Sequence, residues 1–281
     1  MQGFAVLCVT TPPSGRGEEP LWRTRPLPVN PRRSHQGFDE WRLARAAAAD
    51  KSQLDLQVYY WHITVMTVQR PIPDFAAARE AMVENQLRPQ GVTDPALLNA
   101  MRTVRREDFL PIYTRPLAYV DRAVAIGEGR FLAAPAVLGQ LLTEMMPAAG
   151  QRALVVGAGT GYSAAVLAAM GLQVTAVESD AALAGEARSQ KIRVVEGSLE
   201  KGQPEGAPYD QILIDGAVEY IPDAIIEQLA DGGRLGVAIT DRGITRLTVG
   251  RKAGDAFGTL SVGDAGVPAL PGFQRPRAFT F

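Results

Sequence analysis

Apolar residues recur at helical spacing in the segment that follows residue 74. This spacing predicts one helix in DFAAAREAMVENQL and a second in TDPALLNAMRTV. At the start of the second helix, Thr93 or Asp94 can cap the first turn, and Pro95 suits the position after the cap. A third helix is predicted over residues 136–146, where AVLGQLLTEMM places apolar side chains on one face.

Beyond residue 150, short apolar runs alternate with helical patterns. We predict strands in ALVV, QVTAVE, IRVVE, QILID and RLGVAI, and helices from Tyr162, through 182–187 and near 224–229. This order is typical of an α/β fold with a mostly parallel, doubly wound sheet and helices on both faces. Ligands of such sheets bind at the carboxyl ends of the strands. Shorter apolar runs near 247–251 and 278–281 are candidates for an antiparallel edge.

The first 65 residues have a different composition from the rest. They are rich in Pro, Arg and Trp and show little periodicity, so we expect this extension to be disordered or non-native. One hypothesis is that the native chain starts at Met66, and the alternative is a genuine flexible arm. The expected organisation is an extension over 1–65, a helical cap with a substrate-side segment over 66–146, and a ligand-binding α/β domain over 147–281.

Composition and charge narrow the class of protein. The 281 residues are 46% hydrophobic and carry a formal net charge of -1, which gives no bulk electrostatic reason to expect nucleic acid as a partner. No apolar run reaches the about 18 residues of a membrane span, and the start does not resemble a secretory signal. We therefore expect a cytoplasmic globular protein without a membrane partner; its oligomeric state stays open.

Cysteine and histidine are confined to the start of the chain, as Cys8, His35 and His62. From Met66 onward the sequence therefore excludes a Cys/His nucleophile pair, a Ser-His-Asp triad and a zinc site built from thiolates or imidazoles. No metal site is predicted, because the carboxylates show no clustered signature.

A glycine-rich loop, GAGTG, follows the ALVV strand and precedes the helix from Tyr162. Gly157, Gly159 and Gly161 give it the backbone freedom that close approach to a ligand at a helix start requires. Their spacing is one residue shorter than the dinucleotide fingerprint, which favours S-adenosyl-L-methionine over NAD as the cofactor. The alternative is a structural tight turn.

Acidic residues end two of the predicted strands. Glu178 closes QVTAVE, 19 residues beyond Gly159, where a carboxylate can accept hydrogen bonds from ribose hydroxyls. Asp215 closes QILID and points near the same cleft. It can bind substrate, act as a general base, or cap the next turn.

Several fragments over about residues 74–240 resemble the protein-L-isoaspartate O-methyltransferase family. They are MVENQLRPQGVTDPALLNAM, VRREDFLP, AYVDRAVAIGEG, LLTEM, VVGAGTGYSAA, APYDQILIDGA and IPDAIIEQLADGGRL. The resemblance implies a class I S-adenosylmethionine-dependent methyltransferase fold with an N-terminal helical extension. It also implies a protein-repair enzyme that methylates the abnormal carboxyl of L-isoaspartyl residues, with damaged proteins or peptides as its partners.

The chain departs from this family at two places. Where the family continues after AIGEG with Q-T-I-S and then proline, this chain has RFLAAP, which puts Ala133 at the position of the family's active-site serine. The family's Gly-Asp-Gly is replaced by GSL, which leaves Ser198 as the candidate cofactor contact. We expect Arg130 or backbone groups to bind the acceptor carboxylate, and the alternative for Arg130 is a surface arginine. Alternatives for the whole chain are another methyl acceptor, with Asp215 as base, or a cofactor-binding module without catalysis.

Overall fold

The computed structural model describes residues 74–127 and 129–275. The predicted first helix is present as α2 (Phe75–Met82), followed by a π-helical turn (Val83–Leu87) and a 3-10 turn (Arg88–Gln90). The second predicted helix is α3 (Pro95–Thr103). Its cap is Asp94, whose carboxylate accepts a hydrogen bond from the Leu97 amide at 2.8 Å, so the choice between Thr93 and Asp94 is settled.

The segment between α3 and the next helix carries elements that the sequence did not predict. Two 3-10 turns, Arg106–Phe109 and Arg115–Leu117, lead into an antiparallel hairpin of β1 (Val124–Gly127) and β2 (Arg130–Leu132). Helix α4 (Pro135–Met145) follows, within one residue of its predicted bounds. The hairpin brings Arg130 and Ala133 up to the main sheet.

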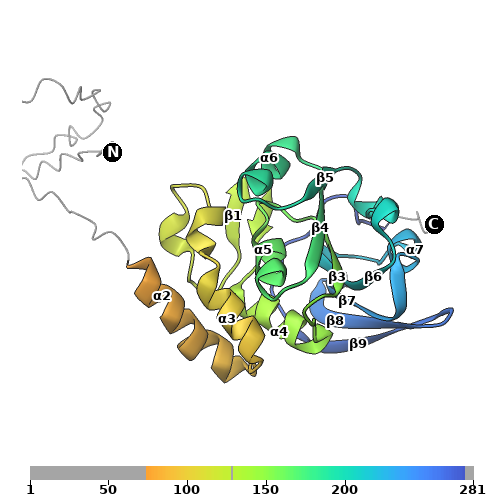
Figure 1. The fold of residues 1–281 in the computed structure, drawn as a ribbon, viewed down its shortest axis with the longest axis horizontal. Helices are drawn as coiled ribbons and strands as arrows, with labels where there is room; N and C mark the ends of the chain where they lie inside the picture. Colours follow the sequence, from red (N-terminus) through yellow and green to blue (C-terminus); the bar gives the residue numbers. More distant parts are fainter. Residues whose placement is uncertain (1–73, 128, 276–281) are drawn as a thin grey trace, which may run out of the picture. The chain divides into compact units, whose positions relative to one another are not determined.

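The main sheet has seven strands in the order β5-β4-β3-β6-β7-β8-β9 (Figure 1). Strands β3 to β7 run parallel to one another, and β8 and β9 add an antiparallel edge. Helices α5 (Tyr162–Ala169), α6 (Ala181–Ser189) and α7 (Asp223–Ile226) lie in crossovers between parallel strands. The strands are β3 (Arg152–Val156), β4 (Gln173–Glu178), β5 (Val194–Glu196), β6 (Tyr209–Val218), β7 (Leu229–Asp241), β8 (Ile244–Ala253) and β9 (Ala256–Asp264).

Two details of the predicted sheet need correction. The helix expected near 224–229 is the short α7, and Leu229 begins strand β7 instead. The run near 247–251 is part of β8, which pairs antiparallel with β7 as expected for an antiparallel edge. On its other side β8 pairs with β9, which the sequence did not predict. The candidate strand at 278–281 lies outside the described residues, as does the predicted extension over 1–65.

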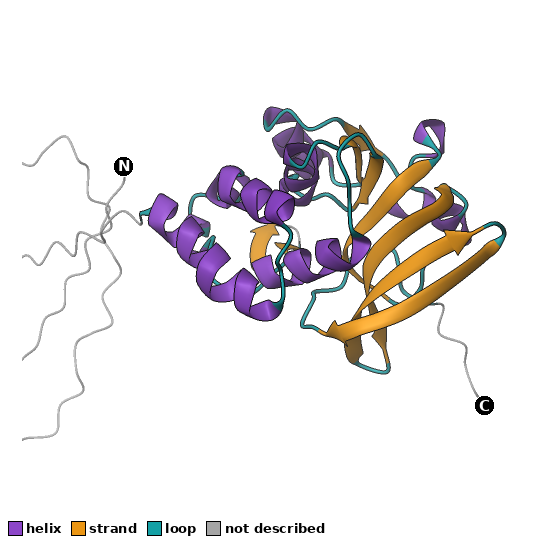
Figure 2. Cartoon of the chain, turned by 60° about the horizontal axis from the view of Figure 1, so that its bottom comes forward, coloured by secondary structure: helices purple, strands orange, loops and turns teal. Residues whose placement is uncertain are grey.

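Apolar side chains fill both faces of the sheet. Along β3, Ala153 and Val155 join a core with helices α3 to α6, whereas Leu154 and Val156 join a second core with Ile225 of α7. This alternation is the period of two that a strand buried on both faces requires. The helices that precede the main sheet gather on one side of the strands (Figure 2). The sheet is therefore doubly wound, and the fold prediction is confirmed.

After β9 the chain passes along the carboxyl ends of the central strands. The amide of Ala217 donates to the Pro268 carbonyl at 2.9 Å, and the Leu270 amide donates to the Ala217 carbonyl at 2.7 Å. We call residues 267–270 the C-terminal strap. Within the described ranges, no helix combines the length and apolar character that a membrane crossing needs. The boundary at residues 146/147 stays a prediction.

Candidate functional site

The glycine loop between β3 and α5 has the backbone conformation that its sequence predicts. Gly157, Gly159 and Gly161 have φ angles of 76°, 56° and 98°, in the left-handed region that favours glycine. Gly161 is the N-cap residue of α5, and the Gly157 amide donates to the Val177 carbonyl of β4. The loop is thus fixed against the neighbouring strand, at the carboxyl edge of the sheet.

The space that these glycines leave is used by side chains of the same chain. A Cβ atom on Gly157 would lie 2.8 Å from Leu270 Cδ1 and 3.3 Å from Arg130 Nη2. A Cβ atom on Gly159 would lie 2.7 Å from Ile126 Cδ1. Side chains of hairpin β1–β2 and of the C-terminal strap therefore approach the glycine loop closely.

Glu178, at the end of β4, is completely buried and accepts hydrogen bonds from several directions. Arg130 forms a bidentate pair with it, with Nη1 2.6 Å from Oε1 and Nη2 3.0 Å from Oε2. The Gly159 amide donates to Oε2 at 2.7 Å, and the amides of Ser179 and Asp180 donate to Oε1. The carboxylate therefore ties the glycine loop, strand β4 and hairpin β1–β2 together.

Arg130 is buried, which overturns the alternative of a surface arginine. In β2 the side chains alternate, so that Phe131 faces outward while Arg130 and Leu132 face inward. Only 6% of Arg130 is exposed, and its Nη2 also donates to the Gly157 carbonyl at 2.9 Å. The expected acceptor-binding residue is thus placed between the glycine loop and Glu178.

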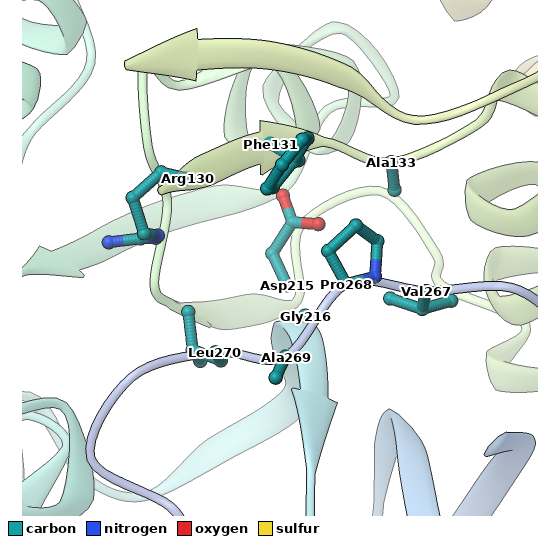
Figure 3. Close-up of a pocket in the computed structure, with 9 residues that line it drawn as sticks. All are labelled: Arg130, Phe131, Ala133, Asp215, Gly216, Val267, Pro268, Ala269 and Leu270. Atoms are coloured by element: carbon teal, nitrogen blue, oxygen red, sulfur yellow. The ribbon is translucent and has the colours of Figure 1, made fainter. Parts of the chain in front are cut away.

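Asp215 lies in a small pocket at the carboxyl edge of the sheet. Ser163 Oγ donates to its Oδ2 at 2.5 Å. Burial raises the pKa of Asp215 above its usual range, and the Ser163 hydroxyl and the nearby Arg130 and Arg106 oppose the rise. Figure 3 shows the Arg130 guanidinium turned away from the Asp215 carboxylate. The pocket is lined by Arg130, Phe131, Ala133, Asp215, Gly216, Val267, Pro268, Ala269 and Leu270.

Ala133, at the position expected for a serine, lines the same pocket and is held through its backbone. Its carbonyl accepts a hydrogen bond from Arg106 Nη2 at 2.6 Å, and Arg106 Nε donates to the Ala118 carbonyl at 2.7 Å. The Arg106 guanidinium is buried, lies 4.8 Å from the centre of the Tyr162 ring, and has its pKa lowered by that burial. Sequence reasoning missed Arg106, since nothing in VRREDFLP distinguishes a buried arginine from its exposed neighbour.

Ser198 is the predicted site residue that lies apart from this group. It follows β5, whose last residue, Glu196, is in register with Glu178, and it is exposed at the start of a 3-10 turn. It does not line the pocket around Asp215. By contrast, the structure brings the three glycines, Glu178, Arg130, Asp215 and Ala133 together at one edge of the sheet. The C-terminal strap was the unpredicted contributor to this edge.

These features place the chain among the class I S-adenosylmethionine-dependent methyltransferases. The residue types match those that bind S-adenosyl-L-methionine. The glycine loop allows close approach to the backbone at the start of a helix, and Glu178 places a buried carboxylate, which can accept hydrogen bonds, beside that loop. In the described ranges no cluster of His, Cys, Asp and Glu side chains suits a metal ion.

Comparisons with known proteins give the family. The model of the protein-L-isoaspartate(D-aspartate) O-methyltransferase family matches residues 77–262. A protein-L-isoaspartate O-methyltransferase from Methylorubrum extorquens is 40% identical over 219 residues, which cover 74% of this chain and 95% of that protein. The chain therefore belongs to the protein-L-isoaspartate(D-aspartate) O-methyltransferase family, an enzyme family with S-adenosyl-L-methionine as its cofactor.

Solved structures agree on the fold. A protein-L-isoaspartate O-methyltransferase has a TM-score of 0.63 at 24% identity, with 69% of this chain and 66% of that chain covered. A crystal structure described as a protein-L-isoaspartate O-methyltransferase from Plasmodium falciparum, in complex with S-adenosyl-L-homocysteine, has a TM-score of 0.60 at 20% identity, with 68% of this chain and 97% of that chain covered.

Proposed function

We propose that this protein methylates the abnormal carboxyl group of L-isoaspartyl residues in damaged proteins and peptides. The observation that carries the proposal is the family match, which extends from helix α2 to strand β9 and includes the glycine loop, Glu178 and Asp215. The S-adenosyl-L-homocysteine in the Plasmodium falciparum structure is the product form of the expected cofactor and supports the same reaction.

The reaction suits a site without cysteine or histidine. A carboxylate is ionised near pH 7 and is already a nucleophile, so no protein group has to remove a proton from it. Bound S-adenosyl-L-methionine supplies an electrophilic methyl group. The chain has to hold the acceptor carboxylate in line with that methyl group and keep water away, and such positioning can supply several kcal/mol of the rate enhancement.

We assign the cofactor to the edge formed by the glycine loop and strand β4. Gly157, Gly159 and Gly161 allow close approach, and Glu178 is the acceptor for the ribose hydroxyls. We also assign Ser198 to the cofactor. This exposed residue follows β5, the strand that pairs with β4. These roles combine the residue chemistry with the positions at the carboxyl ends of parallel strands.

We assign the acceptor carboxyl to the pocket that Ala133, Asp215 and Arg130 line. Without the serine hydroxyl, Arg130 is the described lining residue that can pair with an acceptor carboxylate. The raised pKa of Asp215 favours its neutral form, which lowers the repulsion of an anionic acceptor. The exposed Phe131 and the apolar C-terminal strap line the pocket and restrict water there.

The test is transfer of labelled methyl from S-adenosyl-L-methionine to a pair of peptides, using the full chain. The peptides share one sequence and differ in whether their aspartate is linked through its side-chain or its main-chain carboxyl. We expect transfer to the isoaspartyl peptide to exceed transfer to the aspartyl peptide by about a hundredfold or more, since a site built around one carboxyl position rejects the other.

Equal transfer to both peptides would contradict the proposed acceptor. If neither peptide is methylated, the same assay on heat-aged cell extract separates the alternatives. Labelled product other than isoaspartyl protein would indicate a different acceptor, whereas S-adenosyl-L-homocysteine binding without any labelled product would indicate a binding module.

A further inference from the structure

The hydrogen-bonding capacity of Glu178 is already used in the structure. A carboxylate has about four lone-pair sites. Here Oε1 accepts from Arg130 Nη1, the Ser179 amide and the Asp180 amide, and Oε2 accepts from Arg130 Nη2 and the Gly159 amide. No lone pair is left for a ribose hydroxyl. The backbone donors are fixed by the turn after β4 and by the glycine loop, so Arg130 is the partner that can leave.

Arg130 leaves Glu178 at a high cost in free energy unless another anion takes the place of that carboxylate. Its side chain is 7% exposed and that of Glu178 is fully buried, so a guanidinium that loses this carboxylate stays in a desolvated place. Leaving a buried charge unpaired is far more costly than breaking an exposed ion pair. Displacement of Arg130 from Glu178 is therefore coupled to the arrival of a second negative charge nearby.

The second charge can arrive in the pocket that Arg130 itself lines. Arg130 is the one cationic side chain among the described residues around this pocket, and Asp215 is the one acidic side chain. An acceptor carboxylate that enters this pocket leaves water and needs a cation as its partner, because a desolvated charge without a partner is costly. The guanidinium points away from the Asp215 carboxylate (Figure 3) and is paired with Glu178. A turn of the Arg130 side chain toward the pocket would exchange Glu178 for the carboxylate of the acceptor.

We propose that Arg130 is shared between the cofactor and acceptor sites. Arg130 holds Glu178 until the ribose takes that carboxylate, and it then turns to bind the carboxylate of the acceptor. Cofactor and acceptor consequently bind with positive coupling. The cofactor alone has to break a buried ion pair, whereas in the ternary complex the acceptor supplies the replacement partner. The acceptor half of this inference rests on the proposed function, and the competition for Glu178 does not.

The first test compares binding of S-adenosyl-L-homocysteine to full-length variants by calorimetry. Arg130→Gln removes the competing charge and introduces the residue that the family carries at this place. We expect it to bind S-adenosyl-L-homocysteine about tenfold or more tightly than wild type, the equivalent of one lost charge-assisted hydrogen bond. The control is Arg188→Gln, which breaks an exposed pair with Glu196 on the neighbouring strand and leaves the affinity within about twofold of wild type.

The second test uses the wild-type chain and covers the case in which Arg130→Gln fails to fold. S-adenosyl-L-homocysteine is titrated with and without a saturating L-isoaspartyl peptide, and with the aspartyl peptide as control. We expect the isoaspartyl peptide to strengthen binding by at least about fivefold, and S-adenosyl-L-homocysteine to strengthen peptide binding by the same factor. Where Arg130→Gln folds, it loses this coupling while keeping its higher affinity.

Unchanged or weaker binding by folded Arg130→Gln would overturn the competition for Glu178, and absence of coupling in wild type would overturn the shared role. If methyl transfer to the isoaspartyl peptide is intact in either case, the inference fails and the proposed function survives. If Arg130→Gln binds S-adenosyl-L-homocysteine more tightly but wild type transfers no methyl group to the isoaspartyl peptide, the isoaspartyl acceptor is rejected. The competition between Arg130 and the ribose for Glu178 then stands. If neither protein binds S-adenosyl-L-homocysteine, both are rejected.

Discussion

At the scale of single residues, the centre of the site is a buried ion pair that joins hairpin β1–β2 to strand β4. Taking Arg130 and Glu178 out of water is expensive, and their bidentate bond and the backbone amides around Glu178 offset that cost. Such a pair adds little net stability when it is complete. It becomes strongly destabilising when one partner is removed, and this asymmetry can be measured.

We expect Glu178→Gln to lower the free energy of unfolding by about 3 to 5 kcal/mol, because it leaves the Arg130 guanidinium buried without a counter-charge. The matched control is Glu196→Gln on the next strand, where an exposed pair with Arg188 is lost and the change should stay within about 1 kcal/mol. Urea unfolding followed by circular dichroism measures both. Equal losses for the two variants would show that burial does not govern the pair.

The positions of the glycines and acidic residues of the candidate site were predictable because they follow or end apolar runs. Gly157 follows strand β3 and Glu178 ends β4, and parallel strands bring their carboxyl ends to one edge. Asp215 ends the apolar run of β6, but the strand itself continues to Val218, so the prediction that Asp215 ends its strand was wrong. The pairing of Arg130 with Glu178 was not predictable. It joins residues 48 positions apart and depends on a hairpin whose strands have only four and three residues. Such short runs carry no readable alternation.

At the scale of elements, helix α3 depends on the cap that the sequence left undecided. We expect Asp94→Ala to lower the free energy of unfolding by about 1 kcal/mol, because the Leu97 amide loses its acceptor. Thr93→Ala, one residue earlier, should leave it unchanged within about 0.5 kcal/mol. Chemical denaturation of both variants checks the assignment, and a reversed order of the two effects would refute it.

The C-terminal strap makes a second prediction at this scale. Leu270 is 3% exposed and packs against Gly157 and Gly216, so Leu270→Ala should lower the free energy of unfolding by about 2 to 4 kcal/mol. Leu260→Ala is the control, because that leucine is 69% exposed on β9 and its loss should cost no more than about 0.5 kcal/mol. Denaturant titrations measure both losses. Equal losses of free energy of unfolding in the two variants would contradict the packing role of the strap.

Most of the predicted elements were confirmed, since helices and parallel strands buried on both faces have clear apolar patterns. Strand β9 was missed for a physical reason. Its side chains are exposed or half-buried along its whole length, so it has no apolar face to detect, and its pairing with β8 defines it instead. The strap was missed as well, because its path over β6 is fixed by main-chain hydrogen bonds that no side-chain pattern announces.

At the scale of the whole molecule, the raised pKa of Asp215 links folding to pH. Between the ordinary value of 3.8 and the raised one, the folded chain holds a proton that the unfolded chain has released. The contribution of this group to the free energy of unfolding therefore falls as pH rises through that window. Asp215→Asn cannot titrate and keeps an oxygen that can accept from Ser163.

We expect Asp215→Asn to be more stable than wild type above the window and to lose this advantage as pH falls below 3.8. Urea unfolding of both proteins over a series of pH values gives the difference directly. A variant that is less stable than wild type at every pH would show that the ionised carboxylate is stabilised where it lies.

The number of strands in the antiparallel edge decides at which edge of the sheet the following segment begins. Strand β7 runs parallel to β6 and ends at the edge where the pocket lies; β8 returns to the opposite edge and β9 comes back. Because two strands are added, an even number, the C-terminal strap that follows β9 begins at the same edge as the pocket. With one, the chain would emerge roughly 30 Å away, at 3.3 Å for each of the ten residues of β8. The number of strands in the β8–β9 hairpin therefore decides whether the C-terminal strap can line the pocket.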